Sequence, residues 1–183
     1  MKFDCSIRKS LYSQDECELI REKILESVDP NFIDYPAPNV VKTSEVKMCT
    51  YGNIKSELDK LHQYVLFANQ NYFGLDLFEM SSNTSIMYNT YHEWNQGEYA
   101  WHKDTVENEC FDQKLTALLN LSDTEYVGGQ LELFLSGGAL AITDFNKPGT
   151  MIVFPSWICH RVTPVTQGIR KSLTVFYSGP NLK

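Results

Sequence analysis

Two histidines and one aspartate are the residues of this sequence whose types and spacing best suit metal chemistry. His102 and Asp104 lie two positions apart in a His-Lys-Asp segment, and His160 follows 58 residues later. Two imidazoles and one carboxylate form the three-ligand face that holds iron(II) in non-haem oxygenases and leaves other coordination positions open. Arg170, ten residues beyond His160, supplies a guanidinium that can bind both oxygens of a carboxylate. The pattern predicts a metal site at the first three residues, with an anion-binding group nearby.

The spacing of the first pair suits a β-strand. Alternate strand residues share a face, so His102 and Asp104 would project together while Lys103 points away. A His-x-Asp pair also arises by chance, and His160 would have to arrive from another strand. Of the other two histidines, we interpret His62 as a surface or packing residue and His92 as structural or substrate-side.

The elements that must position these residues change in kind along the chain. Ser13-Gln14-Asp15-Glu16 is typical of a capping box, and it predicts a helix that ends at Asp29-Pro30. A second helix is predicted over residues 53–72 from an apolar stripe at helical spacing. Beyond Phe73-Gly74, short β-rich runs alternate with turn residues. The predicted strands are residues 85–91, 99–104, 115–121, 130–135, 151–154, 159–162 and 172–177.

Helices followed by strands predict an α+β, mainly β fold with a double-stranded β-helix, or jelly-roll, core and N-terminal support helices. A length of 183 residues suits a single domain over residues 1–183. Its helical support would span residues 13–72, and its core residues 85–178. A Pro- and Gly-marked turn between residues 162 and 169 predicts a hairpin with His160 on one arm and Arg170 on the other.

Composition limits the classes of partner and compartment. A net charge of −7 argues against sequence-independent nucleic-acid binding, which needs a basic surface. No apolar run has the roughly 20 residues that would cross a bilayer, and the first residues lack an apolar secretory core. Five cysteines without a CxxC pair indicate reduced thiols. We therefore expect a cytoplasmic protein with neither a nucleic-acid nor a membrane partner.

Two longer motifs add a resemblance to a known family. Tyr99-Ala100-Trp101-His102-Lys103-Asp104, together with the His-Arg-Val-Thr-Pro-Val run that starts at His160 and the later Gly168-Ile169-Arg170, resembles the 2-oxoglutarate and Fe(II)-dependent dioxygenases. The similarity is to their prolyl 4-hydroxylase-like branch, which includes bacterial PKHD-type hydroxylases. It spans roughly residues 85–177.

The resemblance implies roles for particular residues. His102, Asp104 and His160 would bind iron, and Arg170 would pair with the distal carboxylate of 2-oxoglutarate. Tyr91 would also contact this cosubstrate, with Tyr88 as the alternative. Asn120 lies where many relatives place an aromatic cosubstrate contact, although it could equally be an ordinary polar residue at a strand end. The implied cofactors are Fe(II), 2-oxoglutarate and O2, and ascorbate could serve as an accessory reductant.

The implied reaction is hydroxylation of a C–H bond with release of succinate and CO2. The branch favours a prolyl or other amino-acid side chain in a peptide or protein as substrate. A free amino acid or small metabolite is the alternative, and a non-catalytic jelly-roll binding module is a third. Candidate substrate-wall residues are Trp94, Tyr99, Trp101 and Trp157, and candidate lids are residues 34–49 and 92–97.

Overall fold

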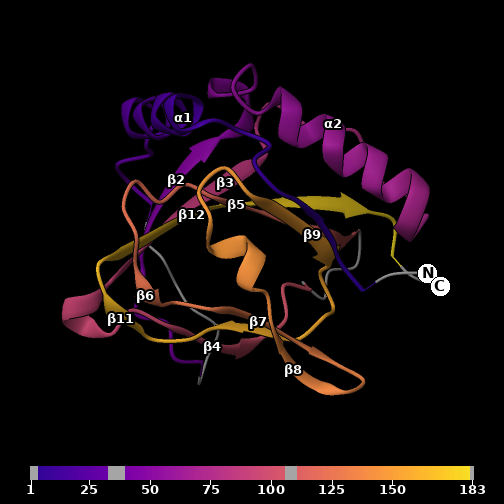
Figure 1. Cartoon of the computed structure of the whole chain (residues 1–183). Helices are drawn as coiled ribbons and strands as arrows, with labels where there is room; N and C mark the ends of the chain where they lie inside the picture. The colour runs from indigo at the N-terminus through magenta and orange to yellow at the C-terminus, as the bar shows by residue number, and fades with distance from the viewer. Residues whose placement is uncertain (1–3, 33–39, 106–110, 182–183) are drawn as a thin grey trace.

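Two packed β-sheets with helices on one outer face form the molecule (Figure 1). The computed structural model describes residues 4–32, 40–105 and 111–181. The larger sheet has six strands in the order β1-β9-β5-β12-β3-β2, and the smaller has four in the order β4-β10-β7-β8. A short ladder joins β11 to β6. This arrangement confirms the mainly β, jelly-roll architecture with N-terminal support helices.

The strands are β1 (Ser6–Arg8), β2 (Glu45–Thr50), β3 (Ser85–His92), β4 (Tyr99–His102), β5 (Asp112–Asn120), β6 (Val127–Gly128), β7 (Leu131–Leu135), β8 (Gly138–Ala141), β9 (Met151–Pro155), β10 (His160–Val162), β11 (Val165–Gln167) and β12 (Ile169–Gly179). The helices are α1 (Gln14–Glu26) and α2 (Asp59–Ala68), with shorter helical turns η1 (Tyr51–Asn53), η2 (Asn69–Phe73), η3 (Glu93–Asn95) and η4 (Thr143–Asn146). Each of the seven predicted strands overlaps an observed one. The sequence did not predict β1, β2, β6, β8 and β11.

The first helix begins where its capping signal predicts. The Ser13 side chain accepts a hydrogen bond from the Glu16 amide, and the Glu16 carboxylate accepts one from the Ser13 amide. Two backbone donors at the helix start are thereby satisfied. The buried face of α1 carries Cys17, Ile20 and Ile24, which lie against the larger sheet.

The second helical region is shorter than predicted. Residues 53–72 were expected to form one helix, but η1 comes first and α2 begins only at Asp59. A wider helical turn, η2, follows α2, and Gly74 caps it with a φ of 65°, in the left-handed region that favours glycine. The apolar residues of the predicted stripe are nonetheless buried at Ile54, Leu58, Leu61, Val65 and Ala68. The first two pack inward from the turn before α2.

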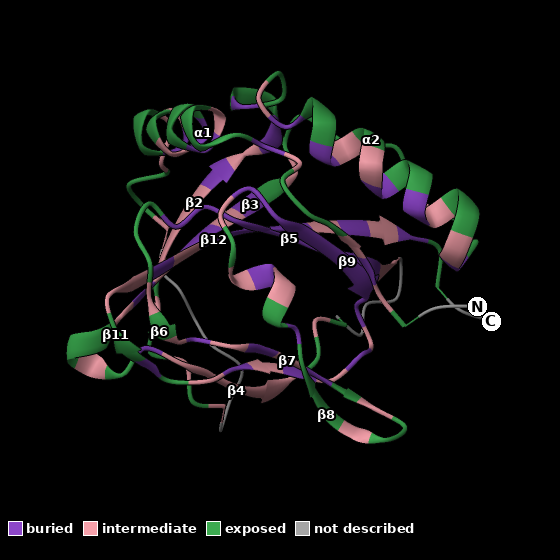
Figure 2. Ribbon diagram, viewed as in Figure 1, coloured by how far each residue is buried: buried purple, intermediate pink, exposed green. Residues whose placement is uncertain are grey.

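The buried side chains form two layers, one on each face of the larger sheet. One cluster joins α1 and α2 to the outer face of the six-stranded sheet, through residues such as Leu119 and Val153. A second cluster fills part of the space between the sheets and includes Leu118, Leu133 and Phe154. Figure 2 shows the larger sheet as mostly buried while the outer surfaces of the helices are exposed. Neighbouring residues Leu118 and Leu119 thus face opposite layers, as strand alternation requires.

The predicted hairpin between His160 and Arg170 is wrong. β10 pairs with β4 and β7 in the smaller sheet, whereas β12 pairs with β3 and β5 in the larger one. The Pro- and Gly-marked turn with β11 therefore carries the chain from one sheet to the other. As a result, His160 and Arg170 line one cavity from opposite sheets.

Two further expectations from the sequence concern the cysteine thiols and membrane-spanning segments. Cys5, Cys17, Cys49 and Cys159 are free thiols, and Cys110 lies outside the described residues. Burial raises the pKa of Cys17 and of Cys49 to about 11, so both stay protonated at neutral pH. Among the helices of the described ranges, none combines the length and apolar character needed to cross a membrane.

The capping box supports a prediction about stability. Ser13→Ala removes the side-chain acceptor for the Glu16 amide, and we expect it to lower the free energy of unfolding by about 1 kcal/mol. Urea denaturation followed by circular dichroism measures this change. Glu18→Ala, an exposed position in the same helix, is the matched control and should stay within about 0.5 kcal/mol of the parent. Equal stability of the two variants would argue against a stabilising cap.

Candidate metal centre

The pairing of two short strands brings the predicted ligands together. β4 and β10 run antiparallel, and His160 lies opposite His102 in their register. Asp104 follows two residues after the end of β4, where its amide donates a hydrogen bond to the Ser156 carbonyl at 3.0 Å. The candidate ligand atoms of all three residues lie within 4.8 Å of one another. The arrangement therefore gathers two imidazoles and one carboxylate at one point between the sheets.

Each imidazole is turned so that the same nitrogen faces that point. Nδ1 of His102 lies 2.7 Å from the Ala100 carbonyl, and Nδ1 of His160 lies 3.0 Å from the Ile158 carbonyl. A carbonyl can only accept, so both Nδ1 atoms must donate, which leaves both Nε2 lone pairs free. Such backbone contacts are the usual means of fixing the tautomer of a metal-binding histidine.

The distances between the ligand atoms suit a shared cation. Nε2 of His102 lies 3.4 Å from one Asp104 oxygen, and Nε2 of His160 lies 3.3 Å from the other. Neighbouring ligands at right angles on a metal about 2.1 Å away would be roughly 3 Å apart. A cation placed between these three groups would contact both Nε2 atoms and the carboxylate. The donor set thus fits a divalent metal ion.

Asp104 is held by more than the histidines. Its second oxygen accepts a hydrogen bond from the Thr116 hydroxyl at 2.8 Å, and that hydroxyl also lies 3.0 Å from the Ser156 hydroxyl. Burial opposes ionisation of Asp104, but His160, His102 and the Thr116 hydroxyl outweigh it and lower the pKa of the carboxyl. Asp104 is therefore ionised and oriented before any metal arrives.

Aromatic rings fix the two imidazole planes. The Tyr99 ring stacks on His102 with centroids 3.5 Å apart, and the Phe154 ring meets His160 edge-on at 4.9 Å. Burial lowers the pKa of His160, which favours the neutral form that a metal requires. These contacts leave the ligands little freedom to rotate away.

The cavity beside the triad is bounded at another point by a buried cation. Arg170 is 1% exposed, and its guanidinium donates a 3.0 Å hydrogen bond to the Ser172 hydroxyl. Its Nε has no hydrogen-bond partner, and no carboxylate in the described part of the chain forms an ion pair with it. The guanidinium lies over the rings of Tyr91 at 4.9 Å and Phe145 at 5.6 Å. A buried charge without a counter-ion is costly, so this group is suited to an anionic ligand.

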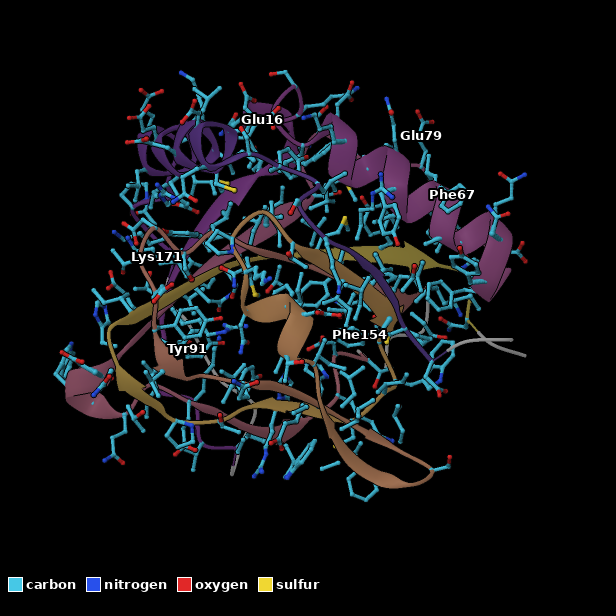
Figure 3. All side chains as sticks on the ribbon, viewed as in Figure 1. Glu16, Phe67, Glu79, Tyr91, Phe154 and Lys171 are labelled. Atoms are coloured by element: carbon cyan, nitrogen blue, oxygen red, sulfur yellow. The ribbon has the colours of Figure 1, made fainter. Side chains whose placement is uncertain are left out.

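Strand alternation distinguishes the two candidate tyrosines of β3. Tyr91 shares a face with Asn89 and Met87, and all three line the cavity. Tyr88 faces the other way and packs in the core between the larger sheet and the helices. Figure 3 shows Tyr91 in the interior between the two sheets. Of the two, Tyr91 is therefore the one placed beside Arg170, which lies opposite it in the strand register.

Asn120 is occupied by structural contacts. Its amide nitrogen donates to the Phe145 carbonyl at 2.8 Å and to the Tyr126 hydroxyl at 3.1 Å, and its oxygen accepts from the Ser122 amide at 2.9 Å. These bonds hold the end of β5 against two loops. A contact between Asn120 and the cosubstrate stays a prediction.

Of the four aromatic residues considered as a substrate wall, Tyr99 lines the cavity. Trp94 is 78% exposed, and the rings of Trp101 and Phe134 pack together away from the cavity. Of the candidate lid 34–49, residues 34–39 lie outside the described residues, while Lys42 lines the cavity.

Several polar residues at the cavity were not singled out from the sequence: the lining residues Lys42, Asn89, Ser172 and Thr174, and Thr116, which binds Asp104. The sequence could have indicated Thr116, which is a polar residue in an otherwise apolar run. It lies two residues before Leu118 in the same strand, so both side chains point between the sheets. Lys42 lies within the candidate lid 34–49, but the sequence did not single it out, since its place at the cavity depends on tertiary structure.

The hydroxyl beside Asp104 generates a prediction about metal affinity. Thr116→Val keeps the shape of the side chain but removes the donor, so the carboxylate loses part of its orientation. We expect the dissociation constant for Fe(II) or Mn(II) to rise about 10- to 100-fold. Thr116→Ser retains the donor and is the control, with a change below about threefold. Calorimetric titration measures both, and indistinguishable values for Val and Ser would remove the role assigned to this hydroxyl.

Comparisons with known proteins agree with this geometry. The PKHD-type hydroxylase of Teredinibacter turnerae is 37% identical over 82 residues, which cover 42% of this chain and 35% of the relative. The PKHD-type hydroxylase YbiX of Escherichia coli is 30% identical over 133 residues, which cover 69% of this chain and 54% of the relative. The chain thus spans at most about half the length of these curated relatives.

The fold has a close structural counterpart, and a family profile covers the site. A crystal structure of a Pseudomonas putida prolyl-4-hydroxylase superimposes with a TM-score of 0.70 at 21% identity, covering 97% of this chain and 94% of that one. The profile of the 2OG-Fe(II) oxygenase superfamily matches residues 86–178, a segment that includes the candidate ligands and Arg170. This chain belongs to the 2OG-Fe(II) oxygenase superfamily, whose members use Fe(II), 2-oxoglutarate and O2.

Proposed function

We propose that this protein is a Fe(II)- and 2-oxoglutarate-dependent dioxygenase that hydroxylates a C–H bond. The observation that carries the proposal is one cavity with two unlike features. A preoriented His102–Asp104–His160 triad lies at one place in its wall, and a buried guanidinium without a carboxylate partner among the described residues lies at another. The first feature suits a divalent metal and the second an anion.

In this proposal His102, Asp104 and His160 hold the iron. When bound, Fe(II) would supply the oxidative chemistry that couples decarboxylation of 2-oxoglutarate to succinate and CO2 with hydroxylation of the substrate. The protein's own task is placement. The aromatic contacts of the two imidazoles keep these ligands in position.

Arg170 would bind the distal carboxylate of 2-oxoglutarate and so set its orientation. Its buried position supports this role, because a charged hydrogen bond is stronger where water does not screen it. The Tyr91 ring beneath the guanidinium and the Ser172 hydroxyl bonded to it keep the guanidinium in place. The cosubstrate would then present its keto-acid end to the metal.

The substrate we propose is a prolyl or other amino-acid side chain in a peptide or protein, because a PKHD-type hydroxylase is similar in sequence and a prolyl-4-hydroxylase is similar in fold. A free amino acid or small metabolite is the alternative. A non-catalytic binding module is disfavoured, since all three ligands and the arginine are present. The cytoplasmic location expected from the sequence is part of this proposal.

One experiment tests the reaction class and then the substrate. Anaerobic addition of Fe(II) and 2-oxoglutarate should produce a visible charge-transfer absorption, which reports chelation of the keto acid by the metal. Admission of oxygen together with peptide and metabolite panels should then release succinate in excess for the true substrate. Iron that binds without any such absorption on adding 2-oxoglutarate would overturn the proposed function.

Loss of a ligand gives a sharp prediction. His102→Ala or Asp104→Ala leaves two protein ligands, which cannot hold the ion tightly, so coupled turnover should fall below detection. Succinate release at saturating iron measures it. His92→Ala is the matched control, because His92 lies on the strand face away from the cavity and should keep parental activity. Full turnover in either ligand variant would refute the triad.

The guanidinium of Arg170 generates a second prediction. Arg170→Ala removes the charged partner of the cosubstrate. We expect a loss of about 2–4 kcal/mol in the binding free energy of 2-oxoglutarate, which corresponds to a roughly 30- to 700-fold higher KM for it. Arg170→Lys keeps a positive charge and should recover part of this loss. A thermal melt verifies that each variant is folded. An unchanged cosubstrate KM in folded Arg170→Ala would reassign the residue.

A further inference from the structure

Two polar residues of the cavity wall have no part in the proposed reaction. Asn89 and Thr174 line the same cavity as the triad and Arg170, and they are only 5% and 9% exposed. The side-chain nitrogen of Asn89 donates a 3.1 Å hydrogen bond to the Thr174 hydroxyl, so we call these residues the Asn89–Thr174 pair. Polar groups that converge on a largely apolar pocket usually orient its ligand. The pair is therefore a candidate for contact with the substrate.

The strand register places the pair between the two parts of the proposed site. Along β12, the residues that line the cavity follow one another as Arg170, Ser172, Thr174 and Phe176. Phe176 lies opposite Thr116, whose hydroxyl binds Asp104, so this end of the row is nearest the triad. Asn89 joins the row from β3, which lies on the other side of β12 from β5. The pair thus flanks the space between the guanidinium and the triad.

The hydrogen bond within the pair determines what each residue offers to a ligand. The Asn89 nitrogen also lies 3.5 Å from the Met87 carbonyl, which can only accept, so the side-chain oxygen is the atom turned to the cavity. Among the described residues, no donor binds that oxygen. The Thr174 hydroxyl receives a hydrogen from Asn89 and keeps its own hydrogen for another acceptor. The pair therefore presents one acceptor next to one donor.

These two groups match the backbone of a peptide. The cosubstrate cannot satisfy the Asn89 oxygen, because the dianion of a keto acid offers only acceptors. In an extended chain the N–H and C=O of one residue point to the same side, as they do in an antiparallel ladder. The pair is also uncharged and buried, which suits a neutral amide, whereas a buried ammonium or carboxylate needs a charged partner.

We propose that the Asn89–Thr174 pair binds the backbone of a peptide substrate. The Asn89 oxygen accepts a hydrogen bond from a substrate N–H, and the Thr174 hydroxyl donates one to a substrate C=O. This inference rests on the proposed function, and it selects a peptide or protein over a free amino acid as the substrate. Holding the backbone here sets the distance between the substrate side chain and the metal.

The test uses protein loaded with Mn(II) and 2-oxoglutarate, which permits binding without turnover. Mn(II) speeds the relaxation of nearby ligand protons, and a titration followed by this effect gives a dissociation constant. A panel of acetyl-alanyl-X-alaninamide peptides, with X each natural amino acid in turn, first identifies the peptide that binds most tightly. Two analogues of that peptide then carry lactate in place of the first or the last alanine. Each analogue changes one N–H to an ester oxygen.

We expect one of the two esters to bind about 5- to 100-fold more weakly than the peptide, because it leaves the buried Asn89 oxygen without a donor. Asn89→Leu has a similar size and removes that oxygen. It should weaken the peptide by a similar factor and leave the affinity for that ester unchanged within about twofold. Such non-additivity is the signature of a direct contact.

Thr90→Val is the matched control, because Thr90 lies next to Asn89 on β3 and does not line the cavity. This variant should keep the parent's preference for the peptide over the ester. A thermal melt verifies that each variant is folded. If Asn89→Leu does not fold, Asn89→Ala removes the same oxygen and takes its place.

Four results would overturn the proposal. No peptide of the panel binds, or neither ester differs from its peptide. Asn89→Leu weakens peptide and ester equally, which indicates a structural role alone. Asn89→Leu changes the 2-oxoglutarate dissociation constant by more than about threefold, which makes the pair a cosubstrate site.

These outcomes are separable from failure of the proposed function. If Mn(II) or 2-oxoglutarate does not bind the parent protein, the reaction class itself is wrong. If both bind and the peptide shows no coupling to Asn89, only the assignment of the Asn89–Thr174 pair fails.

Discussion

The register between β4 and β10 is the constraint on which the site depends. It places His160 opposite His102, and strand alternation turns both imidazoles to the space between the sheets. A slip of one residue would send a histidine to the outer surface, where Trp101 and Arg161 now contact each other. The apolar cluster between the sheets, which includes Leu133 of the neighbouring β7, resists such a slip. Packing of the core therefore fixes the geometry of the ligands.

A second constraint is electrostatic. Arg170 is among the largest fully buried side chains, yet its contacts in the described structure are a hydroxyl and two aromatic rings rather than a carboxylate. The larger sheet, covered by helices on its other face, provides a rigid support for this charge. The smaller sheet and the residues just after β4 hold two imidazoles and a carboxylate. The protein thus separates a cationic region from a metal-binding region, and a dianionic keto acid could join the two.

The sequence predicted the local features well and the long-range ones poorly. The capping box, the buried stripe from Ile54 to Ala68 and the seven strands depend on spacing within a few residues, which a sequence displays directly. The hairpin between His160 and Arg170 was wrong, because a Pro- and Gly-marked turn looks the same whether it joins paired strands or crosses between sheets. Lys42 lies within the candidate lid 34–49 but was not singled out, for a related reason, since its place depends on a bridge to a strand nearly 60 residues away. Tyr91 and Tyr88 were separable only once the face of β3 was known.

The central claim is that three side chains converge on a single ferrous ion. Anomalous diffraction at the iron edge, from crystals grown anaerobically with Fe(II), tests it most directly. The account predicts one strong peak within about 2.3 Å of Nε2 of His102, Nε2 of His160 and a carboxylate oxygen of Asp104. A peak elsewhere in the molecule, with these three side chains ordered and unoccupied, would contradict it.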